Sequence, residues 1–168
     1  IVKAAEHLKN KPNIRFDLFG RGQTKPKAIE MAKRLGLNNI YFHDSVPKTE
    51  VPALIAAADL VVMTLFKSPL IDIYFQNKFI DYMGAGKPIV AAMAGQQAET
   101  IKRWKTGRVV NTFDAKGLSR LVLEAQKQPE MYAEMGQNGK HLVEQNLLLP
   151  NIIDHYCRII EAAANTNG

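Results

Sequence analysis

The sequence predicts an α/β fold, a doubly wound parallel sheet with C-terminal helices, on three observations. Apolar runs of strand length alternate with helix-periodic segments from residue 14 to residue 110, as in successive βαβ units. The run LVVMTL at 60–65 is apolar throughout, which is typical of a strand covered on both faces. After Asp114 only helical periodicity remains. We therefore expect a single domain over residues 1–164 and a frayed tail at 165–168.

The first predicted elements are two helices with a strand between them. Residues 1–8 place apolar side chains at helical spacing. The β-rich run IRFDLF at 14–19 follows and is closed by the glycine turn at 20–22. Residues 25–35 are helix-periodic again, and Gly36 provides a suitable helix stop.

The next stretch repeats the alternation. The strand IYFH is expected at 40–43, and a helix at 49–58, whose Pro52 is tolerated in the first turn. Asp59 separates this helix from the apolar strand at 60–65.

The segment QNKFIDYMGAGKPIVAA at 76–92 combines a helix, a glycine stop and a strand. Asn77 is the expected N-cap of a helix over 77–85, Gly86 ends this helix, and Pro88 starts the strand. The remaining expected elements are a helix at 98–104, a strand at 108–110, a helix capped by Asp114, a helix from Pro129 and a helix after Pro150.

Composition excludes several classes of protein. The 168 residues are 46% hydrophobic and 23% charged, which is ordinary for a globular domain. No apolar run approaches the roughly 20 residues needed to cross a bilayer. Cys157 is the only cysteine, which rules out a disulfide within the chain and fits a reducing, cytoplasmic setting. The net charge of +6 favours anionic partners, but the basic residues are scattered, so we expect no nucleic-acid partner. Because the first helix starts uncapped and without Met at Ile1, we expect a fragment of a longer protein.

Ligands of doubly wound sheets bind outside the carboxyl ends of the strands. The candidate loops are 20–24, 44–49, 66–78 and 93–98. In FGRGQT, Gly20 and Gly22 join a strand to a helix, where backbone N–H groups can approach a phosphate. A dinucleotide fingerprint needs a third glycine where Lys25 stands. Asp44, after the next strand, could still hold the ribose of a dinucleotide, so a nucleotide-cofactor module stays open. His43 has no second residue at metal-ligand spacing, and no metal site is predicted.

The start of the helix at 77–85 is the second candidate. The helix dipole stabilises a carboxylate near a helix start by about 0.3–1 kcal/mol. This stabilisation alone would be a sufficient structural reason for an acid at position 81. Alternatively, Asp81 accepts two hydrogen bonds from a ribose diol, at roughly 1.5–3 kcal/mol for each charge-assisted bond. Lys78 would then lie near the phosphates. The residue types alone weigh the two interpretations equally.

The motifs FGRGQT, HDSVPK, AAAD, KFIDYMGAGKPIV and MGQNGK follow in an order and spacing that resembles one family over nearly the whole chain. The chain is similar to the C-terminal, nucleotide-sugar-binding domain of family 4 (group 1) glycosyltransferases. The resemblance implies a Rossmann-like half of a GT-B fold, a retaining and metal-independent enzyme, and a nucleotide-sugar donor, usually a UDP-sugar, with no cofactor. It also implies a missing N-terminal, acceptor-binding domain, so we expect this chain alone to be inactive.

The resemblance also implies the residues that contact the donor. They are Gly20, Arg21, Gly22, Ser45, Val46, Gln76, Asn77, Lys78 and Asp81. Asp81 corresponds to an acid, usually Glu, that holds the ribose hydroxyls, and Lys78 corresponds to a lysine beside the diphosphate. The family's first acid falls on Ile73, so a catalytic role could only shift to the neighbouring Asp72.

The KFIDYMGAGKPIV box resembles that of bacterial members that build surface polysaccharides and lipopolysaccharides. Such an enzyme is expected in the cytoplasm or peripherally at the inner face of the membrane. Two alternatives remain open from the residues. One is an NAD(P)-binding module that uses Asp44, and the other is a non-catalytic interaction domain.

Overall fold

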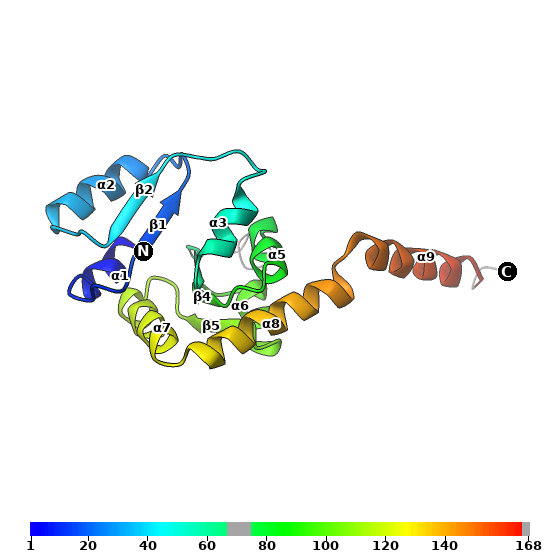
Figure 1. Ribbon diagram of the computed structural model, residues 1–168. Helices are drawn as coiled ribbons and strands as arrows, with labels where there is room; N and C mark the ends of the chain where they lie inside the picture. Colours follow the sequence, from blue (N-terminus) through cyan, green and yellow to red (C-terminus); the bar gives the residue numbers. More distant parts are fainter. Residues whose placement is uncertain (67–74, 166–168) are drawn as a thin grey trace.

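The computed structural model describes residues 1–66 and 75–165 (Figure 1). The strands are β1 (Phe16–Phe19), β2 (Ile40–His43), β3 (Val61–Thr64), β4 (Ile89–Ala92) and β5 (Gly107–Val110). The helices are α1 (Val2–His7), α2 (Lys25–Arg34), α3 (Val51–Ala57), α5 (Asn77–Gly84), α6 (Gln96–Arg103), α7 (Ala115–Lys127), α8 (Pro129–Asn146) and α9 (Leu149–Asn165). Asp72 and Ile73 lie outside the described residues.

The parallel α/β arrangement predicted from the sequence is confirmed, and its strands pair in two ladders. β1 and β2 form one parallel ladder, with Phe16 opposite Ile40. β3, β4 and β5 form the other, with β4 in the centre and Ile89 opposite both Val61 and Gly107. Helical periodicity predicts the helices and apolar runs predict the strands, but neither pattern predicts which strands pair with each other.

β4 is the strand that connects the two hydrophobic cores of the molecule. Val90 and Ala92 join the core that contains α1, α7 and the first ladder. Ile89 and Ala91 point to the opposite face and join the core that contains α5, α6 and α8. Alternate residues of a strand face opposite sides of a sheet, so all of β4 is buried. This position explains the uninterrupted apolar sequence IVAA.

The end of α5 is fixed by the glycine stop that the sequence predicts. Gly86 has a φ of +68°, a left-handed conformation that glycine adopts at no steric cost. Its N–H donates to the Met83 carbonyl at 2.8 Å, and the Lys87 N–H donates to the Tyr82 carbonyl at 3.1 Å. These two bonds are those of a Schellman motif. They turn the chain directly from α5 into β4.

Other predicted boundaries are close to those observed. Asp114 caps α7, because its carboxylate accepts a 2.7 Å hydrogen bond from the Gly117 N–H. α6 begins at Gln96, two residues before the predicted start at 98. α9 continues to Asn165 and extends away from the rest of the molecule (Figure 1).

Candidate functional site

The glycine turn after β1 leaves open space beside its backbone. Gly20 has a φ of +140°, and its N–H donates to the His43 carbonyl at 3.3 Å. A Cβ atom added at Gly20 or Gly22 would meet nothing within 4 Å. Arg21 and Gly22 also line an open surface pocket. A ligand can therefore approach the backbone of this turn, as the sequence predicts.

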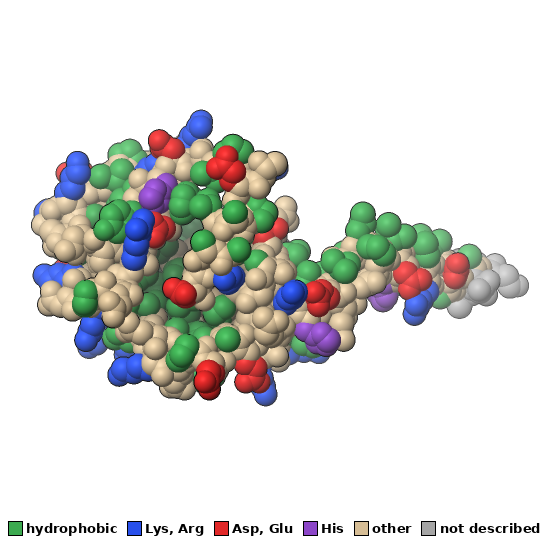
Figure 2. Space-filling view, viewed as in Figure 1, with side chains coloured by type: hydrophobic (Ala, Val, Ile, Leu, Met, Phe, Trp, Pro, Cys, Tyr) green, Lys and Arg blue, Asp and Glu red, His purple; other side chains and the backbone are tan. Residues whose placement is uncertain are grey.

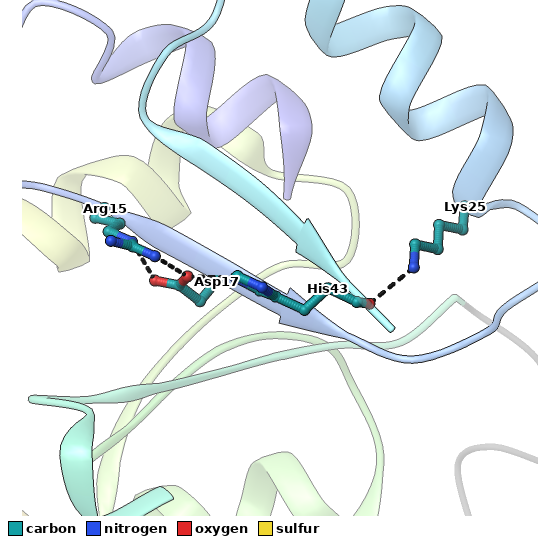
Figure 3. Close-up of polar contacts among 4 residues, drawn as sticks. All are labelled: Arg15, Asp17, Lys25 and His43. Atoms are coloured by element: carbon teal, nitrogen blue, oxygen red, sulfur yellow. Dashed lines mark hydrogen bonds and ion pairs between the residues drawn. The ribbon is translucent and has the colours of Figure 1, made fainter. Parts of the chain in front are cut away.

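A polar network runs along β1, from Arg15 just before the strand to His43 at the carboxyl end of β2 (Figure 3). Arg15 donates two hydrogen bonds of 2.7 Å to Asp17, and His43 Nε2 lies 2.6 Å from Asp17 Oδ1. The His43 ring stacks on Phe19, with 4.4 Å between the ring centroids. Desolvation works to raise the pKa of Asp17, but the hydrogen bonds from Arg15 and His43 outweigh it and hold that pKa below its ordinary value. These contacts give His43 a structural role.

Lys25, at the start of α2, forms an ion pair with Asp44, the residue that would hold the ribose in a dinucleotide site. Its Nζ contacts the His43 carbonyl at 2.8 Å and Asp44 Oδ1 at 2.9 Å. The hydrogen bond from Lys25 lowers the pKa of Asp44. Ser45 is exposed and Val46 half-buried directly after it, at the carboxyl end of β2. The lysine that replaces the third glycine thus engages the candidate ribose acid, which weighs against an NAD(P) site.

The start of α5 differs by one residue from the prediction. Gln76 is the N-cap, in an extended conformation and without a side-chain capping bond, and Asn77 is the first helical residue. The prediction of Asn77 as the N-cap is therefore wrong. The backbone decides this, because the Gln76 carbonyl already accepts the Phe79 N–H at 2.9 Å. The first N–H groups of α5 have no side-chain cap, and such groups are available to an anion.

Lys78 and Asp81 are exposed on α5 and stand three residues apart, so they lie on the same side of the helix. Among the described residues, neither side chain has a hydrogen bond or an ion pair. Desolvation lowers the pKa of the Lys78 ammonium. The first turn of α5 contains no acid, so Asp81 lies beyond the turn where the helix dipole acts most strongly. The dipole explanation of Asp81 is weakened, and a charged pair is left available to a ligand.

The start of α6 contributes a residue that the sequence does not single out. Gln97 is 2% exposed, on the inner face of α6 with Ala98 and Ile101. A signal exists in retrospect, because an amide occupies a face whose other members are apolar. Nothing local in the sequence shows that this face is fully covered.

The comparison with known families shows to which family the chain belongs. The model of the family "Glycosyl transferases group 1" matches residues 1–142 of the chain. The chain belongs to the group 1 glycosyltransferases.

Curated relatives of this glycosyltransferase chain are considerably longer than the chain. The GDP-mannose-dependent α-(1-6)-phosphatidylinositol monomannoside mannosyltransferase of Mycolicibacterium smegmatis is 27% identical over 150 residues, which are 87% of this chain and 39% of the relative. The D-inositol 3-phosphate glycosyltransferase of Streptomyces coelicolor is 26% identical over 119 residues, 70% of this chain and 25% of the relative. The chain thus spans well under half the length of these relatives.

Solved structures of glycosyltransferases have the same fold. HepE of Anabaena in complex with UDP-glucose superposes with a TM-score of 0.78 at 21% identity, over 96% of this chain and 44% of that chain. WaaG, a glycosyltransferase involved in lipopolysaccharide biosynthesis, gives 0.70 at 21% identity, over 86% of this chain and 38% of that chain. The chain therefore has the α/β fold of GT-B glycosyltransferases.

In this chain of the group 1 family the predicted donor residues come from both ladders. Gly20, Arg21, Gly22, Ser45 and Val46 follow β1 and β2, whereas Gln76, Asn77, Lys78 and Asp81 belong to the start of α5, after β3. Within 1–66 and 75–165, no group of three or more His, Cys, Asp and Glu side chains could hold a metal ion. In the same two ranges, no helix combines the length and the apolar character that crossing a bilayer requires.

Proposed function

We propose that the chain is the donor-binding domain of a retaining, metal-independent glycosyltransferase that takes its sugar from a UDP-sugar. The start of α5 carries the proposal, because Lys78 and Asp81 present an ammonium and a carboxylate without partners among the described residues. The family match and the UDP-glucose complex of HepE support it. The pairing of Asp44 with Lys25 supports it against a dinucleotide site.

The proposed chemistry assigns one task to each group. The diphosphate lies at the start of α5, where free N–H groups and Lys78 stabilise the charge that develops on it. Asp81 accepts hydrogen bonds from the ribose hydroxyls. The bond from the sugar C1 to the diphosphate breaks with its electrons going to the diphosphate oxygen. C1 bonds to an acceptor oxygen, whose proton passes to the departing diphosphate oxygen. Acceptor binding is assigned to the remainder of a longer protein, so this chain alone is proposed to transfer nothing.

The proposed setting is the synthesis of bacterial surface polysaccharide or lipopolysaccharide, in the cytoplasm at the inner face of the membrane. The description of WaaG supports this setting. GDP-mannose is a second candidate donor, because the relative from Mycolicibacterium smegmatis is named for it. No cofactor is proposed.

Isothermal titration of the chain with UDP-glucose, UDP-N-acetylglucosamine, GDP-mannose and NAD tests the proposal. We expect a UDP-sugar to bind, and Asp81→Ala to weaken it by about tenfold or more, the equivalent of roughly 1.5–3 kcal/mol for a charge-assisted hydrogen bond. Lys78→Met should weaken both UDP and the UDP-sugar, because it removes a charge beside the diphosphate.

Glu134→Ala is the matched control, since it removes an exposed carboxylate from α8 and should leave the affinity unchanged. Absence of binding by every nucleotide sugar would overturn the proposal. Tight NAD binding that Asp81→Ala does not affect would replace it with the dinucleotide alternative.

A further inference from the structure

Gln97 is a buried amide without a hydrogen-bonding partner. It is 2% exposed, and neither its Nε2 nor its Oε1 forms a hydrogen bond with the described residues. Buried polar groups in folded proteins are nearly always paired, and burying one unpaired destabilises the fold. Gln97 therefore needs an explanation that packing does not provide.

The neighbours of Gln97 show that an apolar side chain would fit this position better. Ala98 and Ile101 on the same face of α6 belong to the core, with Met93 from the end of β4. Each is at most 2% exposed. A methionine of similar length at 97 would be buried among them without an unpaired amide.

Two of the side chains with unpaired buried atoms, Gln97 and Gln76, follow neighbouring strands of the three-stranded ladder. α5 follows β3 and α6 follows β4, and these two strands are hydrogen-bonded neighbours. The Oε1 of Gln76, the N-cap of α5, is also buried without a partner. The other two unpaired side-chain atoms among the described residues belong to Asn39 and Thr106, which precede β2 and β5 at the opposite, amino ends of the strands.

The start of α6 also has free backbone donors beside this amide. Its N-cap is Gly95, which has no side chain with which to cap the helix, so the first N–H groups of α6 lack side-chain partners. Unpaired donors and acceptors thus come from two adjacent helix starts, at the edge of the sheet where ligands of such folds bind.

We propose that Gln97, assisted by Gln76, binds the glycosyl group of the donor through its side-chain amide. The inference rests on the proposed function, in which the diphosphate lies at the start of α5. β4 lies between β3 and β5, so the start of α6 lies on the β5 side of that diphosphate. In the proposed function the base lies at the loop after β2 of the other ladder and the ribose at Asp81 of α5, which leaves the sugar for α6. A sugar hydroxyl donates and accepts hydrogen bonds, and so does an amide.

Gln97→Met separates a ligand contact from a structural role. We expect the variant to raise the melting temperature of the ligand-free chain, because the unpaired amide is removed. We expect its affinity for UDP-glucose, or for the tightest-binding donor of the panel above, to fall about tenfold through the loss of a hydrogen bond. Its affinity for the corresponding nucleoside diphosphate should change by less than about twofold, since the diphosphate contacts remain.

Thr106→Val is the matched control, because it removes another buried, unpaired side-chain atom at the amino end of β5. It should also raise the melting temperature and leave both affinities unchanged. A lower melting temperature for Gln97→Met, with both affinities unchanged, would identify Gln97 as a structural residue that a water satisfies. An equal loss for the nucleoside diphosphate and the donor would contradict the assignment to the sugar. If no nucleotide binds the unaltered chain, the proposed function itself fails, whereas donor binding insensitive to Gln97→Met overturns only this inference.

Discussion

Lys87 shows at the scale of one residue how the KFIDYMGAGKPIV box holds the fold together. Its Nζ donates a 2.7 Å hydrogen bond to the Ala56 carbonyl near the end of α3. The last carbonyls of a helix have no partner within the helix, and a lysine there is favoured by the helix dipole. The lysine of this box therefore joins the α5–β4 turn to α3. Lys87 therefore has a structural task, whereas Lys78 at the other end of α5 is proposed to bind the ligand.

Tyr132 makes the stability of the chain depend on pH in alkaline solution. Its hydroxyl donates to the Leu121 carbonyl at 3.2 Å. Burial, followed by the nearby Glu124, raises its pKa to about 12. The unfolded chain ionises at the ordinary tyrosine pKa of about 10, so this contribution is complete below about pH 10 and is lost as the pH rises to about 12.

Tyr132→Phe should remove this part of the loss of stability in alkaline solution. At neutral pH the variant should be less stable by about 0.5–1.5 kcal/mol, because the hydrogen bond is missing. Urea unfolding of both proteins at several values between about pH 8 and pH 11 measures the difference. Parallel curves of unfolding free energy against pH would show that other groups cause the alkaline loss.

At the scale of elements, the contact between α8 and α5 depends on the absence of a side chain at Gly136. A Cβ atom there would lie 2.1 Å from the Gly86 carbonyl oxygen, which is a backbone atom at the end of α5. A Cβ atom added at Gly139, one turn further, would lie 3.3 Å from Met83. Because the backbone cannot yield as a flexible side chain does, α8 can approach α5 so closely only with glycine at 136.

Gly136→Ala should therefore destabilise the chain by about 3 kcal/mol, since it pushes α8 away from α5. It should also weaken UDP-glucose binding, because α5 carries Lys78 and Asp81. Gly84→Ala is the matched control. Its nearest contact would be Val143 Cγ1 at an ordinary 3.7 Å, so alanine should be neutral or add up to about 1 kcal/mol. Chemical denaturation measures both variants, and equal losses for the two would contradict the steric explanation.

At the scale of the whole molecule, α9 extends from the body with an apolar stripe in solvent (Figure 2). The exposed side chains are Leu149, Ile153, Tyr156, Ile159 and Ile160. Their exposed fractions of 51–68% show that α9 buries little apolar surface against the remainder of the chain. The stability of the body therefore does not depend on α9.

Truncation after Leu148 should change the melting temperature by less than about 2 °C, the equivalent of roughly 0.5–1 kcal/mol in a domain of this size. The truncated chain should also be retained less on a hydrophobic-interaction column, because the apolar stripe is removed. Leu142→Ala, in the buried part of α8, provides the contrast and should lower the melting temperature clearly. A large loss on truncation would show that α9 packs against the body in solution.

The sequence by itself determined the local features of this protein. The glycine stops at Gly36 and Gly86 have left-handed backbones, and Asp114 caps its helix, as predicted. The apolar runs predicted, in order, the five strands of residues 1–66 and 75–165. Such features depend on the conformational preferences of a few consecutive residues.

Only the tertiary structure decided the features that depend on distant residues. In the structure the strands pair in two ladders. The N-cap of α5 is Gln76 and not the predicted Asn77, and Lys25 forms a hydrogen bond with Asp44. The structure also buries Gln97, which the sequence presents as an ordinary polar residue in a helix. Strand pairing, burial and the partners of charged groups result from contacts between segments far apart in the chain, and no local pattern of residues encodes them.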